Sequence, residues 1–124
     1  MEIKIIIAGF LTLFVAVGHF IFGISWYLNP MLKADFDQVP KATLQSVFHY
    51  VSVFLVLAAS ALLMVGFGKL DITAHLPLVR FIGANFILFA IVQIAYSFIN
   101  KVPRPLISMF QWTMFVPIGL LCLL

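Results

Sequence analysis

The sequence predicts an all-α integral membrane protein, a four-helix transmembrane bundle of up-down-up-down topology that forms one domain over residues 1–124. The chain is 65% hydrophobic and only 9% charged, with a mean hydropathy of +1.21. A soluble domain carries about 25% charged residues, so both a soluble fold and intrinsic disorder are excluded. The charged residues leave four uncharged stretches, and a helix needs about 20 residues to cross a bilayer. These stretches are residues 5–32, 42–68, 81–100 and 105–124.

The first two helices are expected at about 4–28 and 42–66. Asn29-Pro30 should close the first helix, because the residue before a proline is pushed out of the helical region. Pro40 lies near the expected start of the second helix, where proline is tolerated. Gly66-Phe67-Gly68 should end the second helix, since glycine is the usual residue just past a helix.

The third and fourth helices are expected at about 78–100 and 104–123. Pro77 and the Pro103-Arg104-Pro105 run lie where these helices begin. None of the apolar runs alternates in polarity, so the strands of a membrane barrel are excluded.

Polar and small residues recur at steps of three and four within each expected helix, which places each set on one face. We expect these faces to point into the bundle, because unpaired polar groups are costly in hydrocarbon. The four sets are Ala8, Thr12, Ala16, His19, Gly23 and Trp26; Ser46, His49, Val53, Val56 and Ser60; Asn85, Phe89, Gln93, Tyr96 and Asn100; and Ser108, Gln111, Phe115, Gly119 and Cys122.

Four polar side chains in these sets fall at one depth. At about 1.5 Å per residue, His19, His49, Gln93 and Gln111 all lie roughly a third of the way through the membrane. Tyr96 lies nearer the surface above them. We therefore take these five as candidate ligand-binding residues, with the two imidazole rings within hydrogen-bond or single-bridge reach of Gln93 or Gln111.

Two interpretations explain such a cluster without catalysis. Hydrogen bonds between polar side chains commonly tie membrane helices together, so the cluster can be purely structural. Alternatively, the cluster anchors a small apolar ligand, a lipid or a quinone, in a pocket walled by Phe and Leu. We expect a non-enzymatic binding or accessory subunit, since the spans hold no nucleophile, carboxylate pair or metal-ligand cluster.

Two further functions remain open as alternatives. His19 and His49 are candidate axial ligands of a haem b, which would make the protein an electron-transfer subunit; otherwise no cofactor is expected. A small channel or proton-coupled transporter is the other alternative, although no charged residue lies within a span. Membrane lipids, a larger membrane complex or a second copy are the expected partners. The net charge of +3 comes from a few flanking cations, so nucleic acid is not expected.

Two short segments look familiar, Gly18-His19-Phe20 through Trp26-Tyr27 and Phe48-His49-Tyr50-Val51-Ser52. Together with the four-span layout they resemble small bacterial four-helix membrane proteins of the DoxX-like group. The resemblance implies location in a bacterial inner membrane and brings no settled activity.

Overall fold

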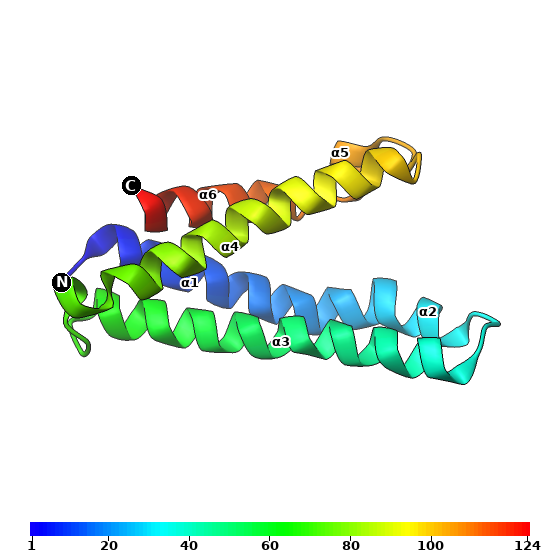
Figure 1. The fold of residues 1–124 in the computed structure, drawn as a ribbon, viewed down its shortest axis with the longest axis horizontal. Coiled ribbons are helices and arrows are strands. Elements are labelled where there is room, and N and C mark those ends of the chain that lie inside the picture. The colour runs from blue at the N-terminus through cyan, green and yellow to red at the C-terminus, as the bar shows by residue number, and fades with distance from the viewer.

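The computed structural model describes residues 1–124 and is helical throughout, which confirms the all-α prediction (Figure 1). Three continuous helical stretches are long and apolar enough to cross a membrane: Ile3–Lys33, Gln38–Gly66 and Ile72–Ile99. The elements are α1 (Ile3–Gly18), the π-helix η1 (His19–Leu28), α2 (Asn29–Lys33), α3 (Gln38–Gly66), α4 (Ile72–Ile99), α5 (Pro105–Ser108) and α6 (Trp112–Leu123).

The sequence predicts that the first helix ends at Leu28. In the structure the helical stretch continues to Lys33. The reason lies in η1, where the backbone N–H of Asn29 bonds to the carbonyl of Ile24, five residues earlier. Proline has no N–H, and in an α-helix its ring crowds the carbonyl four residues before it. The wider π turns carry the chain to Pro30, which then occupies the first turn of α2.

The second long helix, α3, begins at Gln38, a few residues earlier than predicted, with Pro40 in its first turn. Its C-terminus is as expected. Gly68 has a φ of +73°, and its N–H bonds to the carbonyl of Val65. The N–H of Lys69 bonds to the carbonyl of Met64, so two terminal carbonyls are satisfied in a Schellman motif.

The third long helix, α4, also begins earlier than predicted, at Ile72 rather than near residue 78. Asp71 caps its N-terminus by accepting a hydrogen bond from the N–H of Ala74 at 2.9 Å. Pro77 consequently lies inside α4 and not at its start. The Asp71 cap, and not Pro77, therefore sets the start of α4, because the cap satisfies an N–H group that has no partner within the helix.

The prediction of one continuous fourth helix over 104–123 is wrong. It is broken into α5 and α6, with a non-helical backbone at Met109 (φ −117°, ψ 72°). The Trp112 indole N–H donates to the carbonyl of Leu106 at 3.0 Å, an acceptor that a continuous helix would offer to the N–H of Phe110. At 1.5 Å per residue, the 12 residues of α6 reach only about 18 Å, less than the hydrocarbon thickness of a bilayer.

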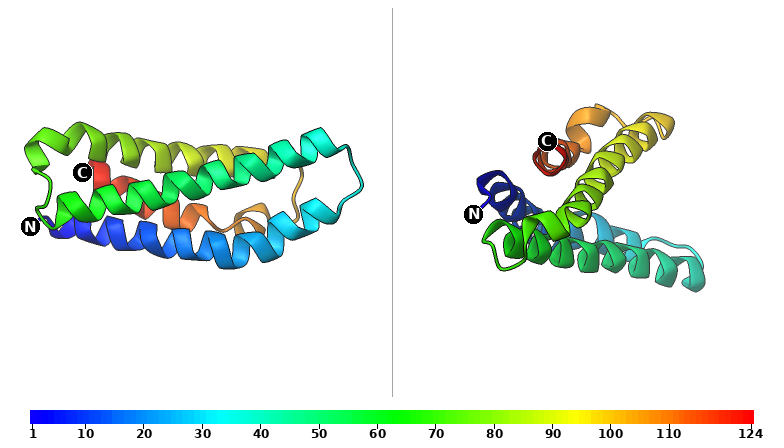
Figure 2. Two further views of the ribbon diagram at one scale, coloured as in Figure 1. Left: turned by 90° about the horizontal axis from the view of Figure 1, so that it is seen from below. Right: turned by 60° about the vertical axis from the view of Figure 1, so that its left-hand side comes forward.

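The elements form two antiparallel pairs, α1–η1 with α3 and α4 with α6 (Figure 1). The pairs meet at the end that holds both chain termini and diverge toward the opposite end (Figure 2). Side chains from both pairs form the core at the closed end. It includes Ile5, Leu62, Val79, Phe86 and Ile118.

Glycines allow each pair to pack closely. A Cβ on Gly83 would lie 3.0 Å from the carbonyl oxygen of Gly119, and a Cβ on Gly119 would lie 3.0 Å from that of Gly83. In the other pair, a Cβ on Gly66 would lie 2.9 Å from the backbone nitrogen of Ile6. Small residues at helix contacts are typical of membrane proteins, whose helices gain little from hydrophobic burial against one another.

The polar face predicted for the second helix points the wrong way. Its members Ser46, His49, Val53, Val56 and Ser60 are exposed. The buried face of α3 instead contains Ser52, Leu55, Ala58, Ala59, Leu62, Val65 and Gly66. Ser46 and Ser60 donate to carbonyls one turn back in their own helix, at 2.9 and 2.8 Å, so their hydroxyls need no partner from another helix.

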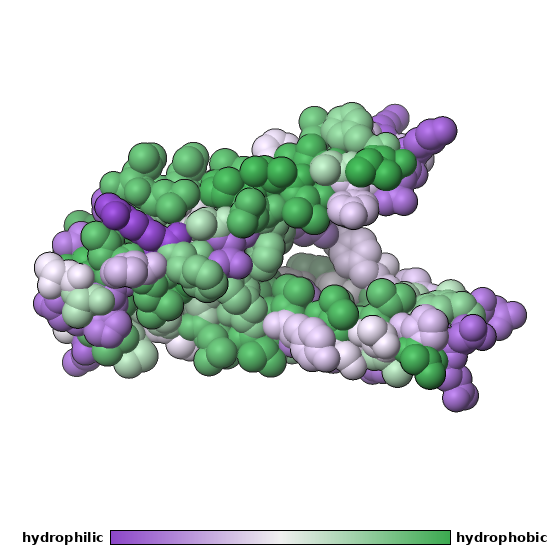
Figure 3. Space-filling model, viewed as in Figure 1, coloured by the Kyte–Doolittle hydropathy of each residue, from purple (hydrophilic) through white to green (hydrophobic).

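The face seen in Figure 3 is mostly apolar over the middle of the molecule, and hydrophilic residues gather at its two ends. An opening between the two helix pairs is visible at the divergent end. This opening contains the candidate site.

Candidate functional site

The site begins where the first helix changes from α to π geometry, at His19. π-Helical turns are rare and occur frequently at functional sites, because the wider turn redirects side chains. Within η1, Gly23 is buried, and a Cβ there would lie 3.0 Å from Cζ of Phe48. The absence of a side chain at Gly23 therefore lets Phe48 of α3 lie against η1.

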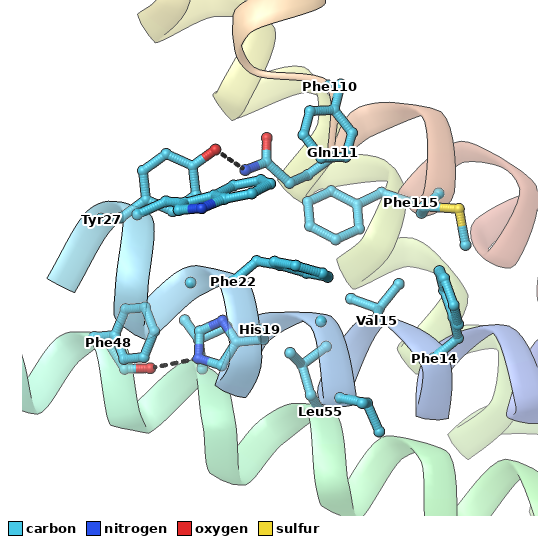
Figure 4. Close-up of a pocket in the computed structure, with 16 residues that line it drawn as sticks. Phe14, Val15, His19, Phe22, Tyr27, Phe48, Leu55, Phe110, Gln111 and Phe115 are labelled. Atoms are coloured by element: carbon cyan, nitrogen blue, oxygen red, sulfur yellow. Dashed lines mark hydrogen bonds between the residues drawn. The ribbon is translucent and has the colours of Figure 1, made fainter. Parts of the chain in front are cut away.

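His19 is held by α3 through both hydrogen bonds and stacking. Its Nε2 lies 2.8 Å from Oγ of Ser52 and 3.2 Å from the carbonyl oxygen of Phe48. The imidazole also stacks on the Phe48 ring, with centroids 4.1 Å apart and planes 17° apart. These contacts fix the position of the ring and leave Nδ1 without a hydrogen-bond partner in the chain (Figure 4).

His49 shares the hydroxyl of Ser52 with His19, as its Nδ1 lies 3.3 Å from that Oγ. The two histidines are therefore on neighbouring helices and joined through one serine. His49 is exposed and borders a shallow groove on the outside of η1 and α3, with Phe20, Val53 and Val56. Ser52 was not among the predicted site residues, because a single serine in an apolar run carries no signal of its own.

The predicted glutamines form a second hydrogen-bonded group, which joins α4 to the broken segment before α6. The Gln93 amide donates to Oε1 of Gln111, and the Gln111 amide donates to the hydroxyl of Tyr27 at 3.2 Å. The group thus reaches η1 at the divergent end of the molecule. Oε1 of Gln93 is buried and has no hydrogen-bond partner.

No hydrogen bond joins the histidines to the glutamines, so the expected single cluster is divided into two groups. His19, Tyr27 and Gln111 line one cleft between the helix pairs (Figure 4). His49 and Gln93 do not line it. Tyr96 is 58% exposed and does not line it either.

The cleft has a volume of about 330 Å³, and 12 of its 16 lining residues are hydrophobic. Aromatic rings from three parts of the chain form much of its wall, with His19 below and Tyr27 and Gln111 above in Figure 4. None of the lining residues is Asp, Glu, Lys or Arg. Besides Tyr27, the aromatic members are Phe14, Phe22, Trp26, Phe48, Phe110 and Phe115.

The arrangement of the two histidines does not fit the axial pair of a haem b. Axial imidazoles face each other across the porphyrin and direct one nitrogen each at the iron. Here a nitrogen of each ring lies against the same Ser52 hydroxyl, and Phe48 stacks on His19. A porphyrin between the two imidazole rings would have to displace the Ser52 hydroxyl and the Phe48 ring.

No protein-family model matches the chain, and no curated protein or solved structure matches it either. The DoxX-like resemblance therefore stays a prediction drawn from short motifs.

Proposed function

We propose that this protein is a non-enzymatic membrane protein that binds a small apolar or amphipathic ligand, a lipid or a quinone, in the cleft between its helix pairs. The observation that carries this proposal is the composition of the cleft wall: apolar and aromatic side chains, with a few uncharged polar groups, among them those of His19, Tyr27 and Gln111. Ligand pockets of about 300–1,000 Å³ typically combine an apolar lining with a few placed polar groups. The cleft is at the lower end of that range.

The same proposal includes a four-helix membrane bundle of up-down-up-down topology. Three stretches are long and apolar enough to cross, and α5, residues 109–111 and α6 together form the fourth crossing. Non-helical backbone at membrane depth is tolerated where it borders a cavity. The backbone N–H groups of Phe110, Gln111 and Trp112 have no acceptor within the chain, and the first two of these residues line the cleft.

We also propose an accessory role in a bacterial inner membrane. The resemblance supports the location, and the outer face of α3 supports a partner. His49 and its neighbours Ser46 and Ser60 are exposed there, where an isolated protein would meet lipid tails. Exposed histidine is costly in hydrocarbon. This cost supports a partner, either a larger membrane complex or a second copy, against that face.

Filling the cleft tests the binding function directly. Gly18 lines the cleft, and a Cβ there would meet no atom within 4 Å, so the side chain of Gly18→Phe can start into open space and its ring should fill part of the cleft. Ile91→Phe, on an exposed position of α4, is the matched control. We expect mass spectrometry of protein purified in mild detergent to find a bound lipid or quinone on the native chain and the Ile91 variant, and none on the Gly18 variant.

Two results would contradict the proposal: a native protein with no bound species, or a Gly18→Phe variant that keeps its full amount. The absorbance spectrum of the same preparation tests the haem alternative. A Soret band would show haem in spite of the imidazole geometry.

A further inference from the structure

The contacts of His19 favour the tautomer in which Nε2 carries the proton. A carbonyl oxygen can only accept, so the 3.2 Å contact with Phe48 requires a hydrogen on Nε2. That N–H also points at Oγ of Ser52, whose own hydrogen is then free for Nδ1 of His49 or for the Phe48 carbonyl. If Ser52 donated to Nε2 instead, two acceptors would face each other at 3.2 Å.

Because the cleft is apolar and holds no carboxylate, a charged imidazole would be costly there and the ring is neutral. With its hydrogen on Nε2, the neutral ring presents Nδ1 to the cleft as an acceptor. The position of Nδ1 agrees with this, because it lies beside the lining residue Gly23, 3.7 Å from where a Cβ would be. Figure 4 shows this nitrogen on the side of the ring turned away from the Phe48 carbonyl.

Tyr27 offers a hydrogen-bond donor to the cleft, whereas His19 offers an acceptor. Its hydroxyl oxygen accepts from the Gln111 amide at 3.2 Å, and the hydroxyl hydrogen has no acceptor in the chain. Among the polar side chains of the cleft wall, His19 therefore offers a free acceptor and Tyr27 a free donor. Since no lining residue is charged, a phosphate or ammonium head group would lie there without a counter-charge.

We propose that the cleft selects a neutral amphipathic molecule with a free hydroxyl group, which donates to Nδ1 of His19 while an oxygen of the same head group accepts from Tyr27. This inference rests on the proposed binding function and deepens it. Two kinds of molecule share this chemistry, a hydroquinone and a partial glyceride. An oxidised quinone or a fully esterified lipid has acceptors only and would leave Nδ1 facing a lone pair.

Two matched ligand pairs separate these sources. The first is a short-chain ubiquinol against the same ubiquinone, and the second is monoolein against methyl oleate, which has no hydroxyl. Native mass spectrometry of the full chain in detergent, with both members of a pair at equal concentration, reports the bound ratio. We expect the hydroxyl-bearing member of at least one pair to be favoured about tenfold, the order that one unmatched hydrogen bond carries.

Variants assign that preference to His19. His19→Phe keeps an aromatic ring against Phe48 but removes Nδ1, so the preference should fall to about twofold or less. Tyr27→Phe removes a donor that both members of a pair can use, so it should weaken the binding of both members and leave the preference near its native value. Tyr96→Phe, an exposed tyrosine outside the cleft, should leave it unchanged. Buried Cys122 should stay protected from maleimide in all three variants, which confirms that they fold.

The outcomes distinguish the two proposals. If neither member of either pair binds the native chain, the binding function itself fails. If both members bind equally, or the member without a hydroxyl binds more tightly, the binding function stands and the hydroxyl selection is overturned. A preference that survives His19→Phe overturns it as well.

Discussion

Oγ of Ser52 lies 2.8 Å from Nε2 of His19, a hydrogen bond between α3 and the start of η1 on one wall of the cleft. Ser52 is buried, and this contact joins two helices that the sequence separates by 33 residues. The bond therefore couples the placement of the cleft histidine to the packing of the first helix pair.

A double-mutant cycle should detect this bond. His19→Leu and Ser52→Ala should each lower the free energy of unfolding by about 1 kcal/mol, with a coupling of about 0.6 kcal/mol, because hydrogen bonds between membrane helices are individually modest. SDS titration in mixed micelles measures the four proteins of the cycle. His19→Leu with Gln93→Leu is the control pair, and its effects should add, since no hydrogen bond joins these residues. A coupling as large in the control pair would contradict the assignment.

Gly119→Ala should destabilise the α4–α6 pair by about 1–3 kcal/mol, the usual cost of overpacking. The added methyl would lie 2.6 Å from the Ile87 side chain and 3.0 Å from the carbonyl oxygen of Gly83. Cys122 lies in the same contact, so its maleimide labelling rate should rise.

Gly18→Ala is the matched control for Gly119→Ala, as its methyl would meet nothing within 4 Å. It should leave stability unchanged or raise it by up to about 1 kcal/mol, because alanine favours helix more than glycine does. Equal effects of the two substitutions would show that close packing at Gly119 is unimportant.

Gly68→Ala should lower stability by about 1 kcal/mol, since the φ of +73° at this position suits glycine and strains other residues. The Cβ itself would meet no atom within 4 Å, so the effect should be purely conformational. Gly68→Asn tests this point in the same SDS titration. Asparagine tolerates the left-handed region, and the variant should recover part of the loss.

The N-cap of α4 should make stability depend on pH. Hydrogen bonds from the Thr73 hydroxyl and the Ala74 N–H lower the pKa of Asp71 below its usual value. A carboxylate whose pKa is lower in the folded state stabilises the fold above its unfolded pKa, about 3.9, and loses that contribution as pH falls through the folded value. We expect the unfolding temperature to fall between about pH 5 and pH 3.

Asp71→Asn isolates that contribution, because asparagine caps a helix without titrating. The variant should match the native protein more closely at pH 3 than at pH 7, whereas Asp71→Ala should unfold a few degrees lower at pH 7. An identical pH dependence in the native protein and Asp71→Asn would assign the effect to another group.

Much of the fold could be predicted from the sequence because the bilayer imposes length and polarity on each segment. The uncharged stretches located the three long helices, and Gly66-Phe67-Gly68 located the C-terminus of α3. Helix starts were less predictable. Asp71 caps α4 ahead of Pro77, and this cap uses local hydrogen bonds that a proline-based boundary ignores.

The inward faces could be predicted only in part. In water an apolar stripe marks the core, but in lipid both the core and the outer surface are apolar, so periodicity does not show which face is buried. The serines of α3 illustrate the difficulty. Ser46 and Ser60 satisfy themselves on their own helix and lie outside, whereas Ser52 bonds to His19 and lies inside.

The amino-acid sequence by itself determined that the chain is helical, apolar over its long segments and supplied with a few intramembrane polar residues. The tertiary structure alone decided how those residues are grouped, because the grouping depends on the π turns of η1, the break before α6 and the divergence of the helix pairs. These features arise from contacts between distant residues, such as Gly83 against Gly119 and Tyr27 with Gln111. Residue spacing records the face of a helix but not the angle at which two helices meet.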